Sequence, residues 1–350
     1  MFSWDATNYY LRRMFGLQSS KSVEDVAVKT VELSPPLIRK NRPTIMLPGK
    51  LDRIVAYCSD TNRELELERL SGDDRKHDGT YAYLLKDAVI INGNLFCDGL
   101  YLPQLAERKH HIWFDLKREK AECALSCSLY GNVYWGHWLL DDCMKYFIAE
   151  QFGAPVVPER KPYGHQTDYE RLLGMSLRSV NAVKFDSLWV FRDEGQNDSK
   201  RLRYQKLRER LLAAIGMENP PEHAGVYLIR GLAGSRRLMT NELEVAERLR
   251  QRGFRVIDPM KLTAEEILRA CAGAKVVAGI DGSGLSHAIA LMAPETTLLV
   301  INPPNRFNNV YKDMTDCMNV NYAVAVGISL GDDFYVDLDE IDQILNLIPT

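Results

Sequence analysis

Residues 276–292 read VVAGIDGSGLSHAIALM and carry the clearest indication of the fold. An apolar run ends at Gly279, a short loop follows, and a helical segment begins at once, which is the pattern of a strand, a tight turn and a helix. Strands are also expected at residues 226–230, 254–257 and 297–301, with helices of about ten residues between them. This alternation predicts a parallel sheet with helical crossovers, so we expect an α/β, Rossmann-like domain in the C-terminal half.

Capping residues indicate where two helices of this half begin. Asn241 followed by Glu244 resembles a capping box, and the helix it starts is expected to stop at Gly253. Thr263 and Glu266 form a second pair of the same kind. Both helices fall between predicted strands, which supports the crossover pattern.

The N-terminal half is less regular. Residues 81–113 are β-rich, with a hairpin turn at 92–94, and residues 135–152 show the three- and four-residue spacing of a helix. Residues 216–224 combine glycine, proline and charge, as interdomain linkers do. We therefore expect two domains, residues 1–218 and 219–350.

Composition excludes several classes of protein. With 46% hydrophobic residues and a net charge of −3, the 350-residue chain is neither disordered nor generally attracted to nucleic acid. Its seven cysteines contain no CxxC pair, so neither a disulfide framework nor a zinc ribbon is expected. No apolar run is long enough to span a bilayer and no secretory signal is recognisable, so we expect a cytoplasmic protein. The aromatic-rich residues 1–18 form either a helix packed on its own domain or a segment that touches a membrane surface.

The loop after the strand at 275–279 has features of an anion site. Its small residues let the backbone approach a ligand, and the N–H groups at the start of the next helix favour a phosphate. These residues are Gly282, Ser283 and Gly284. Three cationic side chains on or after the first strand of the same half match phosphate geometry, namely Arg230, Arg236 and Arg237. The alternatives are a plain turn and a solvated basic loop, but both features fall at the carboxyl edge of one predicted sheet, where α/β proteins bind ligands.

A second group of polar residues lies within the predicted helix at 135–152. His137 and Asp141 are four residues apart and share a face, whereas Asp142 points away from them. The apolar neighbours are expected to raise the proton affinity of a carboxylate here, as a general base requires. The alternatives are a surface acid pair, a histidine that caps the helix, and a metal site.

Three stretches together resemble glycosyltransferase family 61. Residues 132–146, NVYWGHWLLDDCMKY, are similar to the family's N-x-x-H-W-L-L-[DE]-[DE] segment, with Asn132 further ahead of His137 than usual. Residues 226–242 resemble its strand–Arg–S-R-R-L-x-N-E segment, and residues 280–304 resemble its H-G-A-G-L-x-N segment and the strand that follows. The resemblance extends over residues 81–325. Two residues depart from the pattern: Asp281 replaces the usual histidine, and Asn302 replaces a glutamate.

The resemblance implies two Rossmann-like domains facing a cleft (the GT-B type) and an inverting, metal-independent transfer from a nucleotide sugar, with no cofactor. The acceptor is expected to be a glycan or lipid-linked glycan in surface (capsular) polysaccharide synthesis, and the sugar a hexose or pentose. Asp141 is expected to act as the base, with His137 positioning it or the acceptor and Asp142 in reserve. The donor diphosphate is assigned to the following residues: Arg230, Ser235, Arg236, Arg237, Gly282, Ser283 and Gly284.

Two other functions remain open from the sequence. One is a metal-assisted hydrolase of a phosphorylated sugar, which would use His137, Asp141 and Asp142. The other is a non-catalytic subunit of a glycan-assembly complex, because an acidic side chain at position 281 repels a diphosphate. The only D-x-D pattern, Asp337 and Asp339, is expected to be a surface element.

Overall fold

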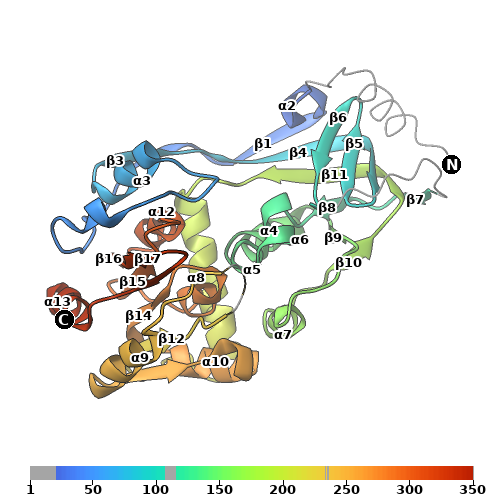
Figure 1. Cartoon of the computed structure of the whole chain (residues 1–350). Coiled ribbons are helices and arrows are strands. Elements are labelled where there is room, and N and C mark those ends of the chain that lie inside the picture. The colour runs from blue at the N-terminus through green and yellow to red at the C-terminus, as the bar shows by residue number, and fades with distance from the viewer. Residues whose placement is uncertain (1–20, 107–115, 233, 235, 350) are drawn as a thin grey trace. The chain divides into compact units, whose positions relative to one another are not determined.

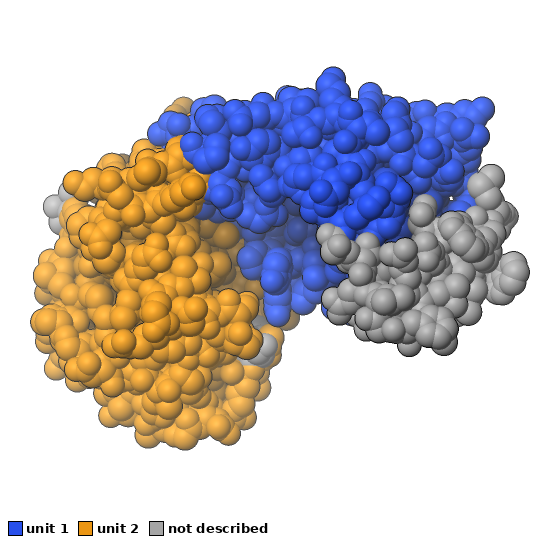
Figure 2. All heavy atoms as spheres, turned by 90° about the horizontal axis from the view of Figure 1, so that it is seen from above, with its two compact units in different colours: residues 1–36, 78–203 blue, residues 37–77, 204–350 orange. Residues whose placement is uncertain are grey.

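The computed structural model describes residues 21–106, 116–232, 234 and 236–349. It contains two compact units (Figure 2): a first unit of residues 1–36 and 78–203, and a second unit of residues 37–77 and 204–350. Residues 1–18, expected to form either a packed helix or a segment that touches a membrane surface, lie outside the described residues. No helix in the described part of the chain is both long and apolar enough to cross a bilayer.

A five-stranded parallel sheet organises the second unit (Figure 1). The strands follow the order β13-β12-β14-β15-β16. Their bounds are β12 His223–Leu228, β13 Phe254–Ile257, β14 Ala274–Ile280, β15 Thr297–Asn302 and β16 Asn321–Val326. Nearly every residue of β14 and β15 is buried, as expected of strands covered by helices on both faces. The predicted parallel α/β sheet is confirmed, and its order reverses between β12 and β14, where such sheets bind ligands.

Helices follow the strands of this sheet. They are α9 Glu242–Gln251, α10 Ala264–Cys271, α11 Ser286–Ile289, α12 Val310–Cys317 and α13 Leu338–Leu347. The capping box of Thr263 and Glu266 is confirmed at the start of α10. The one predicted at Asn241 is wrong, because the Asn241 side chain bonds the Val336 backbone instead.

The second unit also includes residues 37–77, which precede most of the first unit in sequence. This segment contains β2 Leu37–Lys40, the 3-10 turn η1 Lys50–Arg53, α3 Arg63–Leu70 and β3 Asp74–His77. The Ile45 backbone exchanges hydrogen bonds with Tyr322 and Val324 of β16. The chain thus changes unit at residues 36/37, 77/78 and 203/204 instead of once at 218/219, and residues 216–224 lie inside the second unit.

The first unit is built on a mixed sheet in the order β10-β9-β8-β11-β4-β5-β6. Its long central pair, β4 Thr80–Ile91 and β11 Val183–Arg192, is antiparallel, whereas β8 Cys123–Leu125, β9 Ala154–Pro158 and β10 Arg178–Val180 run parallel to β11. The other strands are β1 Lys29–Ser34, β5 Asn94–Cys97, β6 Leu100–Pro103 and β7 Lys117–Glu119. A Rossmann-like domain in this half is therefore not confirmed.

The predicted hairpin of this unit is confirmed between β4 and β5. Asn92 and Gly93 form its turn with φ values of 48° and 70°, the left-handed conformations that a tight two-residue hairpin turn requires. The helices are α2 Val23–Val26, α4 Leu129–Val133, α5 Trp135–His137, α6 Cys143–Phe152, α7 Gln166–Leu172 and α8 Asp198–Ala214, which continues into the second unit.

Candidate active site

The predicted helix at 135–152 exists, but it is interrupted. Between α5 and α6 lies a five-residue π-helical turn, η2 Trp138–Asp142. Such turns insert a residue into an α-helix and are frequent at functional sites. Here the turn carries both acidic residues singled out from the sequence, Asp141 and Asp142.

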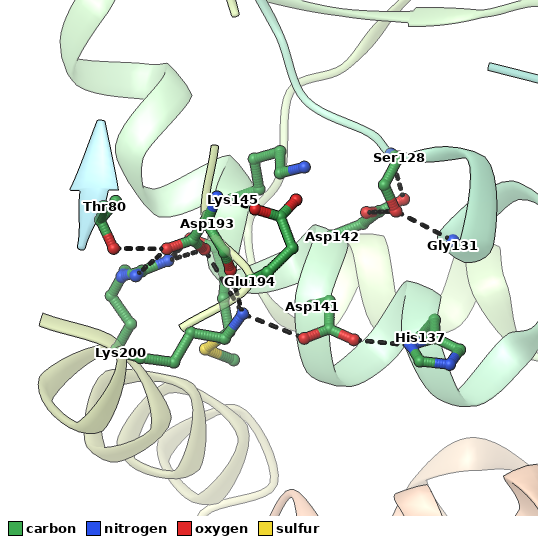
Figure 3. A network of polar contacts seen from close by, with 12 residues as sticks. Thr80, Ser128, Gly131, His137, Asp141, Asp142, Lys145, Asp193, Glu194 and Lys200 are labelled. Atoms are coloured by element: carbon green, nitrogen blue, oxygen red, sulfur yellow. Dashed lines mark hydrogen bonds and ion pairs between the residues drawn. The ribbon is translucent and has the colours of Figure 1, made fainter. Parts of the chain in front are cut away.

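His137 and Asp141 form a hydrogen-bonded pair, as their spacing predicts. His137 Nδ1 lies 2.8 Å from Asp141 Oδ2 (Figure 3), and the side chains are 33% and 23% exposed. An ionised carboxylate can only accept, so Nδ1 carries the proton and the other ring nitrogen, Nε2, is left as the basic atom. The pair therefore has the geometry of a histidine oriented by a carboxylate.

A buried lysine holds the other oxygen of Asp141. Lys200 of α8 donates from Nζ to Asp141 Oδ1 at 3.0 Å and to the Asp193 carbonyl at 3.0 Å, and its side chain is 1% exposed. Arg203 binds the Asp193 carboxylate through two hydrogen bonds of 2.6 Å, and Thr80 donates to it at 2.9 Å. The result is a chain of alternating charge that ends at His137 (Figure 3). Lys200, Asp193 and Arg203 were not identified from the sequence.

This network assigns different acid–base roles to His137 and Asp141. Burial acts to raise the pKa of Asp141, but the charge of Lys200 and the hydrogen bond to His137 outweigh it and hold that pKa below its usual value. Burial acts to lower the pKa of His137, but the bond to Asp141 raises it above the ordinary value. The expectation that apolar neighbours raise the proton affinity of a carboxylate in this segment is therefore wrong for Asp141, but it is confirmed for Asp142.

Asp142 points away from this pair, as predicted, and performs a different task. It is buried and accepts hydrogen bonds from Ser128 Oγ at 2.8 Å and from the Ser128 backbone N–H at 3.2 Å. Burial raises its pKa to about 6. The carboxylate lies against Gly131, where a Cβ would collide with it. Asp142 therefore anchors the short helix α4 and does not face His137.

In the second unit, two of the predicted arginines meet the predicted glycine loop. Arg237 Nη1 donates to the Asp281 carbonyl at 2.6 Å and to Asp281 Oδ2 at 2.8 Å, and the two side chains are 10% and 4% exposed. The Arg230 guanidinium lies over Gly282, where a Cβ would collide with it. Gly282 has φ 152° and ψ 165°, a conformation that is essentially restricted to glycine. This cluster lies at the carboxyl ends of β12 and β14, where the strand order reverses.

The cluster explains how Asp281 is accommodated. Burial raises the pKa of Asp281, while Arg237 and Arg230 act to lower it and supply the compensating charge. Arg237 Nε is buried without a hydrogen-bond partner among the described residues. A guanidinium with an unused buried donor is what an anionic ligand would satisfy. Glu242 supports the site by accepting the backbone N–H groups of Arg230 and Gly231 at 2.7 and 2.9 Å.

The other residues predicted to bind the diphosphate of the sugar donor are placed differently from Arg230, Arg237 and Gly282. Arg236 is 63% exposed and pairs with Asp333 at 2.7 Å instead of joining Arg230 and Arg237. Ser283 starts a single 3-10 turn, Ser283–Leu285, and α11, which follows it, has only four residues, so the loop does not lead directly into the helix expected there. Gly284 lies exposed in the same turn. Ser235 is outside the described residues.

Within the described ranges, no three histidine, cysteine or acidic side chains gather as metal ligands would. Asp337 caps α13 by accepting the Asp339 backbone N–H at 2.9 Å, which gives the D-x-D pattern a structural role. All seven cysteines are buried, and none of them forms a disulfide bond.

Comparison with known proteins agrees with the motifs. The glycosyltransferase 61 family model matches residues 135–299, just under half of the chain. The matched stretch contains His137 and Asp141 of the first unit and Arg230, Arg237 and Gly282 of the second. No curated protein matches the chain. The family resemblance is confirmed, and the activity it supports is glycosyl transfer.

Proposed function

Residues 135–299 carry a glycosyltransferase 61 domain, and from this premise we propose that the protein transfers a hexose or pentose with inversion from a nucleotide sugar to a glycan or lipid-linked glycan acceptor. The observation that carries the proposal is the 2.8 Å pair of His137 and Asp141, fixed from behind by Lys200. It provides an oriented base within the matched stretch.

We assign the base to His137 instead of Asp141. Asp141 ionises too readily to hold a proton near neutral pH, whereas His137 has a raised pKa and an available Nε2. His137 Nε2 takes the proton of the acceptor hydroxyl as that oxygen bonds the anomeric carbon. The bond from this carbon to the diphosphate oxygen breaks in the same step, so the configuration inverts. Asp141 holds the tautomer and stabilises the imidazolium.

The arginine cluster of the second unit is proposed to bind the donor. Arg230 and Arg237 would neutralise the diphosphate and stabilise the charge that develops on it as it leaves, which is the task that a metal performs in other enzymes. Gly282 lets the backbone approach this group closely. Asp281 is compensated by Arg237, so it does not repel the ligand as an uncompensated carboxylate would. We extend the proposal to a metal-independent enzyme of surface polysaccharide synthesis that works in the cytoplasm.

Transfer assays with a panel of nucleotide sugars and glycan acceptors test the reaction. His137→Ala is expected to lower kcat by about 10²–10⁴-fold, the usual contribution of a general base. Asp141→Asn should retain more activity than His137→Ala, because the base remains and only its orientation and charge partner are lost. The matched control is Asp98→Asn, an exposed carboxylate of the same unit. Larger loss in Asp141→Asn than in His137→Ala would return the base to Asp141.

Donor binding is tested separately by calorimetry with nucleoside diphosphates. Arg237→Ala should weaken binding by about 10- to 150-fold, the equivalent of one charge-assisted hydrogen bond. No hydrolysis or transfer with any donor, together with retained folding, would favour the non-catalytic subunit. Activity that disappears with a chelator and returns with a divalent metal would favour the metal-assisted hydrolase.

A further inference from the structure

Two tyrosines beside His137 are unusually exposed. Tyr130 and Tyr134 are 56% and 44% exposed, more than any other aromatic side chain in the part of the chain that the structure describes. Their ring centroids lie 5.6 and 6.1 Å from that of His137. Large aromatic rings are normally buried because their apolar faces gain most from leaving water. Two exposed aromatic rings therefore lie directly beside the imidazole that we propose as the base.

Hydrogen bonds to neighbouring residues hold α4, the short helix that contains Tyr130 and has Tyr134 as its C-cap residue, in place. Ser128 caps α4 by accepting the Gly131 N–H at 3.0 Å, and Asp142 holds Ser128 through both carboxylate oxygens. Asn132 Nδ2 donates to the Gln104 carbonyl at 2.8 Å.

Two further contacts come from the segment that precedes α7. Arg160 Nε donates to Asn132 Oδ1 at 2.7 Å, and Tyr163 Oη donates to the Gly131 carbonyl at 3.0 Å. A five-residue helix is marginal by itself, so these contacts are what fix the tyrosines in place. A preorganised aromatic surface binds a ligand without the entropy cost of ordering it.

The chemistry of the pair identifies the ligand class. An aromatic face carries partial negative charge, and it attracts the weakly positive C–H groups of a sugar ring. The hydroxyl groups at the edge of that ring stay available for hydrogen bonds. A general base must lie within hydrogen-bond reach of the proton that it removes, and a ring seated on these tyrosines is adjacent to His137.

We infer that Tyr130 and Tyr134 form the acceptor subsite and stack a pyranose ring, so that the nucleophile is a sugar hydroxyl and not that of a lipid or a protein side chain. This inference rests on the proposed function and deepens it by naming the acceptor class. Two consecutive aspartates would then position both parts of the site, since Asp141 orients the base His137 and Asp142 anchors the helix α4 that presents the tyrosines.

Saturation-transfer NMR with the full-length protein tests the subsite without a donor. The probes are the methyl pyranosides of glucose, galactose, mannose and N-acetylglucosamine. At least one is expected to receive saturation through its C–H protons, and Tyr130→Leu and Tyr134→Leu should each weaken its binding about tenfold, the loss expected of one aromatic contact. Tyr130→Phe and Tyr134→Phe keep the ring and should bind like the unmodified protein. Val28→Ala, an exposed apolar side chain of the same unit, is the control.

The outcomes are distinguishable from failure of the proposed function. If no pyranoside binds, or if the leucine variants bind as well as the unmodified protein, the subsite is refuted even where sugar transfer itself is observed. Loss of binding to phospholipid vesicles, or of self-association in sedimentation, in the leucine variants without any change in pyranoside binding would assign the tyrosines to a membrane or to a second copy and would also overturn the inference. If pyranosides bind but no donor is ever consumed, Tyr130 and Tyr134 still form a pyranose-binding surface, but the transferase function and the role of this surface as an acceptor subsite both fail.

Discussion

The substitution Asp142→Asn measures the free-energy cost of ionising the buried carboxyl group that anchors α4. The usual pKa of aspartate is 3.8, and burial raises that of Asp142 to about 6. One pKa unit corresponds to 1.36 kcal/mol, so ionising this side chain in the folded protein costs about 3 kcal/mol. Because the folded-state pKa is the higher one, the favourable contribution of the protonated acid is complete below pH 4 and is lost as the pH rises through 6.

Asparagine cannot ionise, so its own cost is the same at every pH. The free energy of unfolding of Asp142→Asn, minus that of the unmodified protein, should therefore rise by about 2.4 kcal/mol between pH 4 and pH 7. Urea unfolding followed by tryptophan fluorescence measures this, because Trp135, Trp138 and Trp189 lie in the first unit. Asp98→Asn, which alters an exposed carboxylate, should show no such rise. A difference that stays flat with pH in Asp142→Asn would refute the assignment of a costly buried charge.

Three further predictions concern the two clusters. Lys200→Met leaves the Asp141 charge without its buried partner and should destabilise the first unit by about 3–5 kcal/mol in the same fluorescence assay; unchanged stability would mean that the ion chain contributes nothing. Gly282→Ala should displace the Arg230 guanidinium and weaken nucleoside diphosphate binding by about tenfold or more in calorimetry, while tryptophan-detected unfolding stays unchanged. The pH profile of kcat/KM should rise through the pKa of His137 above its ordinary 6.5, and in Asp141→Asn this limb should move to lower pH because the carboxylate that raises that pKa is lost.

The features predicted from the sequence are those determined by local patterns. Strands β14 and β15 are buried along almost their whole length, and β14 ends at Gly279 and Ile280, so the loop at Gly282 lies at the carboxyl edge of the sheet. Helical spacing was enough to pair His137 with Asp141. These signals need only a few neighbouring residues.

The features missed depend on contacts between distant residues. Helix α8, with the sequence DSKRLRYQKLRERLLAA, reads as a solvated charged helix, yet Lys200 is buried because Asp193 and Asp141 compensate its charge. The π turn at Trp138–Asp142 has no pattern that distinguishes it from α-helix. Residues 37–77 belong to the second unit because the Ile45 backbone pairs with β16, and no local sequence pattern indicates that pairing.

The early position of residues 37–77 in the chain affects the order in which the second unit can fold during synthesis. Ile45 leaves the ribosome long before Tyr322 and Val324, the residues with which its backbone pairs, have been synthesised. Within residues 37–77, β2 can pair with β3, but the contacts of this segment with β16 must wait until the strands of the first unit that follow it have been synthesised. Contacts this distant in sequence form slowly and leave strand edges exposed in the meantime. A truncated chain that stops after α8 would keep this segment without its sheet, so separate expression of the two units requires removing residues 37–77 from the first and grafting them onto the second.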